Sequence, residues 1–291
     1  MNSDCMLCQL KSISRHIKTV SISETDRLDI IREFLAYLSS VDKNTTNPEM
    51  AAQLNRLIAA HHPEKEIYRL EKEEFNQAML ELYDTWHHKA TQSDKPLHTA
   101  MKLAIAGNII DFGPDHEFDA ETVIESVLET NLAVDDSTTM FQDISKAKNI
   151  LYLADNAGEI VMDKLFISLI GHPGLKVAVR GKPVLNDVVM EDACRVGLDK
   201  LVPLIHNGTD IPSTVLKKCS REFLETYQQA DVVISKGQGN LEGLINERDK
   251  NIYFLFTVKC DAIARLTSTQ TGDFVVMHAH RLPDCDKEPC L

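Results

Sequence analysis

The sequence predicts an α/β protein in which an N-terminal helical part precedes a doubly wound, mainly parallel sheet. Two observations support this fold class. Up to about residue 148, apolar residues recur at helical spacing, whereas from residue 149 short apolar runs alternate with helical patterns. Strands separated by helices imply right-handed βαβ crossovers, which build a parallel sheet. We therefore expect a helical region over residues 1–148 and an α/β region over residues 149–291.

The helical part shows clear start signals and apolar stripes. Ser23 is a good N-cap for a run with one apolar face, and Asn47-Pro48 combines a cap with proline in the first turn. Acidic residues crowd the starts of the last two helices, as helix N-termini favour. The expected helices cover residues 12–20, 24–38, 48–58, 63–90, 95–106, 119–131 and 136–145.

The second part contains short apolar runs separated by helical segments. Runs of this length and composition are typical of strands that are buried on both faces of a parallel sheet. The expected strands cover residues 150–154, 175–179, 201–205, 232–235, 253–256 and 274–277.

Composition and charge exclude several classes of protein. The formal net charge of −13, with no long basic run, argues against nucleic acid or an anionic membrane surface as a partner. No apolar stretch is long enough to cross a membrane, so we expect a cytoplasmic protein. Seven cysteines, an odd and scattered number, do not suggest a disulfide framework. The Cys5-x-x-Cys8 pair and the C-terminal Cys285 and Cys290 do not by themselves indicate a metal site or a redox function.

Polar residues follow the first predicted strand directly. Asp155 and Asn156 directly follow residues 150–154 and precede a predicted helix over residues 160–170. Side chains at the carboxyl end of a parallel strand point into the crevice where open α/β sheets bind ligands. Two oxygen ligands before a helix N-terminus suit a divalent cation that holds a phosphate. A simple helix cap is the alternative, because Asp and Asn commonly serve that role.

Two further loops fall on the same edge of the predicted sheet. Asn186 and Asp187 follow the second strand, and Lys236-Gly-Gln-Gly-Asn240 follows the fourth. In the latter loop Gly237 and Gly239 expose backbone amides beside an ammonium group, which suits a bound anion. The loop lacks the spacing of a Walker A motif, and no GxGxxG motif follows the first strand.

Together these loops predict a site for metal-assisted phosphoryl hydrolysis. Two aspartates with asparagine form an oxygen-rich set typical of Mg²⁺ or Mn²⁺ sites that keep positions open for water and substrate. Lys236 would neutralise the anion. A separate segment, residues 106–113, carries Asn108 and Asp111 between two glycines. It is either a ligand-contacting bend or a helix end that leads into a buried connector.

These loops resemble the signature loops of the damage-control phosphatases, a family long catalogued as domain of unknown function 89. The likeness covers nearly the whole chain and is greatest to the short prokaryotic branch. It rests on Leu-Ala-Asp155-Asn156-Ala-Gly-Glu159, Lys-Pro-Val-Leu-Asn186-Asp187, Ser-Lys236-Gly-Gln-Gly-Asn240, Cys5-x-x-Cys8, Gly107-Asn108-Ile-Ile-Asp111 and Val258-Lys259-Cys260. The Asp-Asn pair with the later Asp is fairly specific, whereas the CxxC motif is not.

The resemblance implies a helical region packed on a Rossmann-like three-layer α/β/α sandwich, and a metal-dependent phosphatase that hydrolyses small phosphorylated metabolites. It implies Asp155, Asn156 and Asp187 as ligands of Mn²⁺, Ni²⁺, Co²⁺ or Mg²⁺, and Lys236 as a phosphate contact. Asp192 is a rival to Asp187 but lies within the next predicted helix. Gln238 departs from the Asp that is common in eukaryotic relatives, which affects the expected substrate. The remaining expected pocket residues are Asn108, Asp111, Glu159, Asn186, Gly237, Gly239, Asn240 and Lys259.

Two other functions are compatible with this sequence. One is an S-adenosylmethionine-dependent carboxyl methyltransferase, although the loop after the first strand lacks the glycine-rich turn that such enzymes use. The other is a non-catalytic metabolite-binding protein, which would bind its ligand without turnover. For a phosphatase, candidate substrates are sugar phosphates, nucleotides and phosphopantetheine-type metabolites. No oligomeric state follows from the sequence.

Overall fold

The computed structural model describes residues 3–42, 44–62, 67–107 and 128–283 and shows an α/β fold around a seven-stranded sheet. The strands lie in the order β1-β7-β6-β5-β2-β3-β4. This arrangement confirms the predicted class, a mainly parallel sheet with helices. The strands are β1 (Val134–Asp135), β2 (Ile150–Leu153), β3 (Leu175–Val179), β4 (Leu204–His206), β5 (Val232–Lys236), β6 (Ile252–Thr257) and β7 (Phe274–His278).

Strand β2 lies inside the sheet, between β5 and β3, and is the point from which the chain winds in both directions. From β2 the chain adds β3 and β4 on one side, then returns to place β5 and β6 on the other, all parallel. Ligands of open α/β sheets bind at such a reversal of strand order, beyond the carboxyl ends of the strands. The ends of β2 and β5 flank this point.

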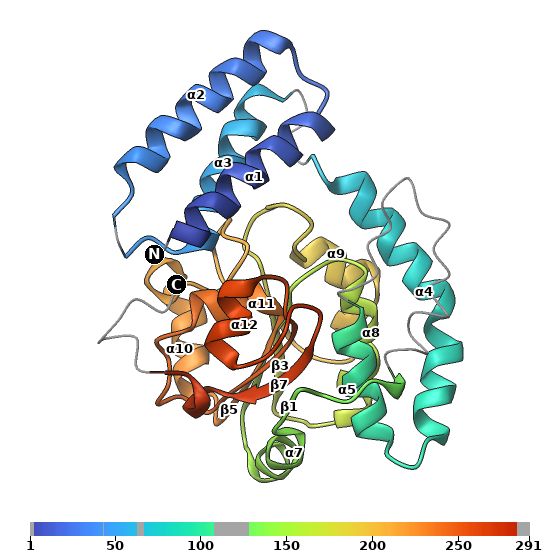
Figure 1. The fold of residues 1–291 in the computed structure, drawn as a ribbon. Coiled ribbons are helices and arrows are strands. Elements are labelled where there is room, and N and C mark those ends of the chain that lie inside the picture. Colours follow the sequence, from blue (N-terminus) through green and yellow to red (C-terminus); the bar gives the residue numbers. More distant parts are fainter. Residues whose placement is uncertain (1–2, 43, 63–66, 108–127, 284–291) are drawn as a thin grey trace.

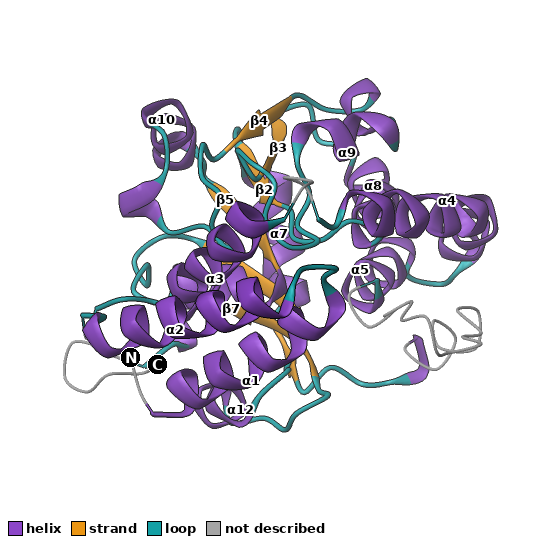
Figure 2. Ribbon diagram, turned by 90° about the horizontal axis from the view of Figure 1, so that it is seen from above, coloured by secondary structure: helices purple, strands orange, loops and turns teal. Residues whose placement is uncertain are grey.

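Helices cover both faces of the sheet, so the fold has three layers (Figure 2). Alternate residues of β2 enter two different cores: Tyr152 packs in one, and Leu151 and Leu153 pack in the other. The first core is closed by α4 (Arg69–Gln92), α5 (Pro96–Ala106), α7 (Ser137–Lys146) and α8 (Glu159–Ile170). The second is closed by α10 (Arg221–Gln229), α11 (Gly237–Gly243) and α12 (Asp261–Thr267).

Three N-terminal helices form a cap with its own apolar core, above the sheet in Figure 1. They are α1 (Ser3–Thr19), α2 (Glu24–Ser40) and α3 (Asn47–His61). Helix α3 joins the cap to the sheet region, because Asn47 Nδ2 donates to Glu242 of α11 at 2.9 Å. Arg56 of the same helix pairs with Asp210, again across the two parts. The cap therefore lies over the strand ends that carry the predicted site.

The remaining elements are short helices in the connections of the α/β part. Helix α9 (Met190–Arg195) follows the loop after β3. It contacts α4, a helix of the N-terminal half, through the ion pair between Asp192 and Lys72. The other three are η1 (Leu198–Lys200), η2 (Leu216–Lys218) and η3 (Ala279–Arg281).

The structure differs from the sequence-based expectation in three strands. Strand β1 was not expected, because its two residues are too few to show a pattern. Strand β7 runs antiparallel to β6, and β4 begins three residues later than expected. The division at residue 148 stays a prediction, although β1 and α7 precede that residue and join the sheet and its core. Within the described residues, no helix is both long and apolar enough to span a membrane.

Candidate functional site

The loops after β2 and β3 lie directly against each other. Asn156 and Asp187 form an isolated antiparallel bridge between them. On either side, Ala157 N donates to Asn186 O and Val188 N donates to Asp155 O, each at 2.9 Å. These backbone bonds bring the predicted metal-binding residues Asp155, Asn156 and Asp187 together.

An arginine that the sequence analysis did not select joins the two aspartates. Arg180 Nε donates to Asp187 Oδ2 at 2.6 Å, and Nη2 donates to Asp155 Oδ1 at 3.3 Å. All three side chains are buried. Burial raises the pKa of the Asp187 carboxyl to about 7, although Arg180 opposes the shift, and the nearby Asp155 charge adds to it. Arg180 comes directly after β3, a position that could have identified it.

Asn156 extends this cluster toward helix α8. Its Nδ2 donates to Asp155 Oδ2 at 2.9 Å and to Glu159 Oε2 at 3.3 Å. Within the described residues, Asn156 Oδ1 and Asp187 Oδ1 accept no hydrogen bond. One carboxamide oxygen and one carboxylate oxygen are therefore available to a ligand.

Lys236 lies on the far side of Glu159 and is fully buried. Its ammonium donates to Glu159 Oε1 at 2.5 Å, to Asp163 Oδ1 at 2.6 Å and to Ala104 O at 2.7 Å. An ammonium group has three hydrogens, so this arrangement leaves none for a phosphate. The expectation that Lys236 contacts phosphate stays a prediction, and the structure gives it a different set of partners.

The charges around Lys236 shift one another strongly. Burial lowers the pKa of Lys236, but Asp163 and Glu159 outweigh it and hold that pKa above its usual value. Burial raises the pKa of Glu159 to about 7 against the opposing effect of Lys236. Asp163 also accepts a hydrogen bond from Tyr152 at 2.7 Å. Asp163 is not among the residues predicted from the sequence, although a second carboxylate one turn after Glu159 in an apolar helix is a usable signal.

These contacts form one continuous buried network with an excess of negative charge. It joins four carboxyl groups (Asp155, Glu159, Asp163 and Asp187) to two cations (Arg180 and Lys236), so the ionised form of all four carries two negative charges in excess. A divalent cation would balance this excess. In the described part of the chain, no three His, Cys, Asp or Glu side chains are grouped to hold a metal. A metal here would therefore depend on the Asn156 carboxamide as a ligand.

Helix α11 begins directly after β5, where a loop was expected, and its first residue lies close to Asp155. Gly237 has φ +77°, and a Cβ atom at this position would lie 1.9 Å from Asp155 Oδ2. Only glycine fits there. Asn240, three residues further on, serves the fold: its Nδ2 donates to Ala154 O and Lys236 O, and its Oδ1 accepts from Thr214. The O atom of Gly239 accepts a hydrogen bond from Ser213.

The other predicted residues are placed less tightly. Lys259 is exposed beyond β6, and its backbone N–H donates to Gln238 Oε1 at 2.8 Å. Asn186 is half-buried beside Asp187. Asn108 and Asp111 lie outside the described residues, although the preceding Gly107 packs close to Glu159 Cα.

The rival carboxylate Asp192 has a structural partner. Its Oδ2 lies 2.7 Å from Lys72 Nζ of helix α4, and both side chains are buried. The same oxygen accepts the Val189 N–H and so caps α9. The Asp192 side chain therefore stabilises the contact between α4 and α9, and Asp187 is the carboxylate that faces Asp155. Of the CxxC pair, Cys5 is buried in the cap and Cys8 is exposed.

Comparisons with known proteins identify the family. The model of the damage-control phosphatase ARMT1-like domain matches residues 1–275. A damage-control phosphatase from Pyrococcus horikoshii is 43% identical over 61% of this chain and 63% of its own length. An uncharacterized protein from Methanocaldococcus jannaschii is 30% identical over 94% of both chains. A damage-control phosphatase from Archaeoglobus fulgidus is 27% identical over 93% of this chain and 96% of its own.

A solved structure shares the fold. The crystal structure of a protein of the domain of unknown function 89 family from Pyrococcus horikoshii superposes with a TM-score of 0.88. The sequences are 29% identical, and the match covers 96% of this chain and 99% of the other. Two of the three relatives are named damage-control phosphatases.

Proposed function

The chain belongs to the damage-control phosphatase ARMT1-like family, and on that premise we propose that it is a metal-dependent phosphatase of small phosphorylated metabolites. The observation that carries the proposal is the buried network at the ends of β2, β3 and β5. It holds two more carboxylates than cations. Two of its oxygens, Asn156 Oδ1 and Asp187 Oδ1, accept no hydrogen bond within the described residues.

Asp155, Asn156 and Asp187 would hold the divalent cation, which we propose to be Mn²⁺, Ni²⁺, Co²⁺ or Mg²⁺. All three present hard oxygen ligands on adjoining loops. When bound, the cation would supply Lewis-acid activation of a phosphoryl oxygen and of an attacking water. Arg180 holds the two aspartates in place through the bonds described above.

Lys259 and the backbone amides near Gly237 are the groups that we propose to bind phosphate. Lys259 is exposed at the carboxyl end of β6, next to β5. The charges of Lys259 and Asp155 both act on the Glu242 carboxyl group. Burial raises the pKa of Glu242, the Asp155 charge raises it further, and the Lys259 charge lowers it. Lys236 instead holds Glu159 through a short ion pair, and Glu159 in turn accepts from Asn156. Lys236 is therefore a positioning residue in this proposal.

Hydrolysis of p-nitrophenyl phosphate tests the proposal. The protein is stripped of metal, and Mg²⁺, Mn²⁺, Co²⁺ and Ni²⁺ are added back singly to wild type, Asp155→Asn and Asp199→Asn. Asp199 is an exposed aspartate and serves as the matched control. We expect turnover that returns with metal in wild type and Asp199→Asn but not in Asp155→Asn. Folded wild-type protein that shows no turnover with any of the four metals would overturn the proposal.

A substrate panel then narrows the class of metabolite. Sugar phosphates, nucleotides and phosphopantetheine-type compounds are compared by kcat/KM, with Lys259→Gln beside wild type. Loss of a phosphate contact should lower kcat/KM by about 10-fold or more, since hydrogen bonds to charged groups contribute about 1.5–3 kcal/mol. An unchanged kcat/KM in Lys259→Gln would reject the assigned role of that residue.

A further inference from the structure

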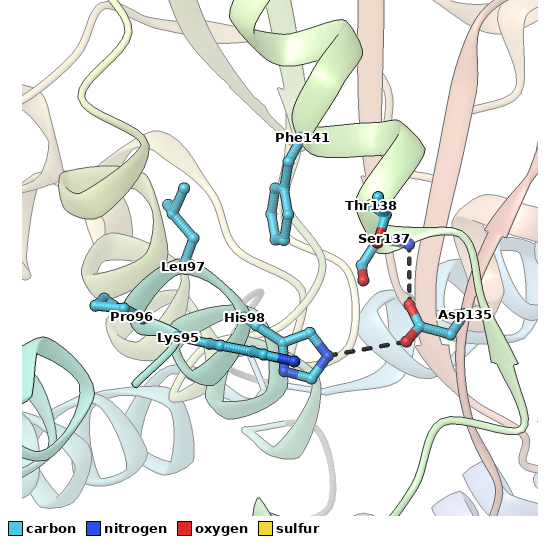
Figure 3. Close-up of a pocket in the computed structure, with 8 residues that line it drawn as sticks. All are labelled: Lys95, Pro96, Leu97, His98, Asp135, Ser137, Thr138 and Phe141. Carbon is cyan, nitrogen blue, oxygen red and sulfur yellow. Dashed lines mark hydrogen bonds and ion pairs between the residues drawn. The ribbon is translucent and has the colours of Figure 1, made fainter. Parts of the chain in front are cut away.

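A cavity of about 520 Å³ lies at the other end of α5 from Lys236, between the start of α5 and the junction of β1 with α7 (Figure 3). This volume is in the range of pockets for small organic ligands. The cavity is remote from the strand-end network. Helix α5 is 11 residues long, which corresponds to about 16 Å at the α-helical rise. Its last turn contacts Lys236 through Ala104 O, and its first turn lines the cavity.

Two helices begin at this cavity. The first residues of α5, including Leu97 and His98, and the first residues of α7, Ser137 and Thr138, line its wall. The N–H groups of a first helical turn have no partner within the helix and carry partial positive charge. Convergence of two such termini favours an anionic ligand.

The side chain of Ser137 provides a second, independent indication of a ligand. Ser137 is 2% exposed and lines the cavity. Its backbone N–H donates to Asp135 Oδ1 at 3.0 Å, but its hydroxyl makes no hydrogen bond within the described residues. The hydroxyl therefore has unused hydrogen-bonding capacity at the cavity wall, which an acceptor placed in the cavity would fill.

The charged groups at the cavity are also consistent with an anion. Lys95 is exposed at the rim, and His98 Nε2 lies 3.9 Å from Asp135 Oδ2. Among the described residues that line the cavity, Asp135 is the one carboxylate, and it already faces His98 and the Ser137 N–H. Leu97 and Phe141 supply an apolar wall. In Figure 3 the side chains of Phe141, Ser137 and His98 surround the same space.

From this arrangement we propose that the cavity is an accessory site for a small organic anion with an apolar, aromatic body. The body packs on Leu97 and Phe141. The anionic group accepts from the Ser137 hydroxyl and the first-turn amides, near the Lys95 ammonium. The proposal does not depend on the phosphatase function, because it concerns other residues and is tested by binding.

Calorimetric titration of the metal-stripped full chain with three naphthalene probes of similar size tests this proposal. The probes are 2-naphthoate, its neutral carboxamide 2-naphthamide, and the cation 2-naphthylmethylamine. We expect one naphthoate per chain, bound at least 10-fold more tightly than either other probe. No naphthoate binding, or equal or tighter binding of the amide or amine, would overturn the proposal.

Variants then locate the bound naphthoate. Ser137→Ala should weaken binding by about 10-fold, because a hydrogen bond to a charged group is lost. Lys95→Gln, a change at an exposed position that leaves the core untouched, should weaken it several-fold, whereas Lys176→Gln on β3 serves as the exposed control and should not. Asp155→Asn should bind like wild type. Unchanged affinity in Lys95→Gln, or affinity lost in Asp155→Asn, would place the ligand elsewhere and reject the site.

Discussion

Helix α5 has contrasting polar surroundings at its two ends. At its carboxyl end Ala104 O accepts from Lys236, whose ammonium also binds two buried carboxylates. At its amino end, the described residues that line the cavity include a single carboxylate, an exposed lysine and the Ser137 hydroxyl, which has no partner among the described residues. The first region is dense in charge and negative in excess, whereas the second is sparse in charge and lined partly by apolar side chains.

The difference shows that partners and burial, rather than the number of charged residues, indicate the ligand that a region accepts. Where charged groups are buried and bound to one another, the charge left over determines the ligand, and here it favours a cation. Where few groups are present, the unfilled hydrogen-bonding capacity of buried atoms determines it, and here it favours an anion. Removal of single charges from buried and exposed ion pairs can test this distinction.

The largest loss of stability should follow from Lys72→Met. This change leaves the buried Asp192 carboxylate without its ammonium partner, so we expect the free energy of unfolding to fall by about 3–5 kcal/mol in urea denaturation. Lys176→Met on the exposed face of β3 is the control. The double variant Lys72→Met/Asp192→Asn should recover most of the loss, because the uncompensated charge is gone. A loss below 1 kcal/mol in Lys72→Met would show that the buried pair does not hold α4 to α9.

Asp187→Asn should have the largest effect on activity. The substitution keeps the shape of the side chain but removes the charge that faces Asp155 and Arg180. We expect metal-dependent kcat/KM to fall by at least about 100-fold, comparable to loss of a key electrostatic contact in other enzymes. The free energy of unfolding, measured in parallel, separates this effect from misfolding. Activity within a few-fold of wild type would contradict the role of Asp187.

A smaller effect on activity is expected from Gly237→Ala. A methyl group there would collide with Asp155 Oδ2 and impose a left-handed backbone on alanine. We expect roughly 10-fold lower kcat/KM as Asp155 is displaced. Gly272→Ala is a matched control, because its φ of +96° carries similar strain but no atom lies within 4 Å. Equal activity in the two variants would mean that close contact with Asp155 is unimportant.

The smallest effect should come from the exposed ion pair between the cap and the sheet region. Arg56 binds Asp210 through two hydrogen bonds of 2.6 Å, but its side chain is 47% exposed. Exposed pairs contribute about 1 kcal/mol or less because water and salt screen them. Arg56→Gln should therefore lower Tm by a few degrees at most, and less at 0.5 M NaCl. A loss of stability as large as that of Lys72→Met would contradict the expectation that the exposed ion pair stabilises the fold less than the buried one.

The sequence was sufficient to predict which polar residues meet at the strand ends. Asp155, Asn156 and Asp187 follow two apolar runs, and the carboxyl ends of neighbouring parallel strands share one edge. The fold class followed from the same alternation of strands and helices. Both inferences depend only on local patterns along the chain.

The partners of these residues could not be predicted in the same way. Lys236 was expected to face a ligand, but it turns toward Glu159 and Asp163 of α8, a helix that follows another strand. Which of several neighbours a long ammonium side chain selects depends on packing between distant segments. The antiparallel direction of β7 could not be predicted either, because an apolar run does not indicate the direction in which its strand runs in the sheet.

Binding of Mn²⁺ to the metal-stripped protein tests the central claim most directly. Electron paramagnetic resonance of free Mn²⁺ during titration gives the number of bound ions and their affinity without any substrate. We predict one tightly bound ion per chain in wild type and in the Asp199→Asn control, and at least 10-fold weaker binding in Asp187→Asn. Folded wild-type protein that binds no Mn²⁺, or an Asp187→Asn variant that binds it equally well, would contradict the assignment of this network as a metal site.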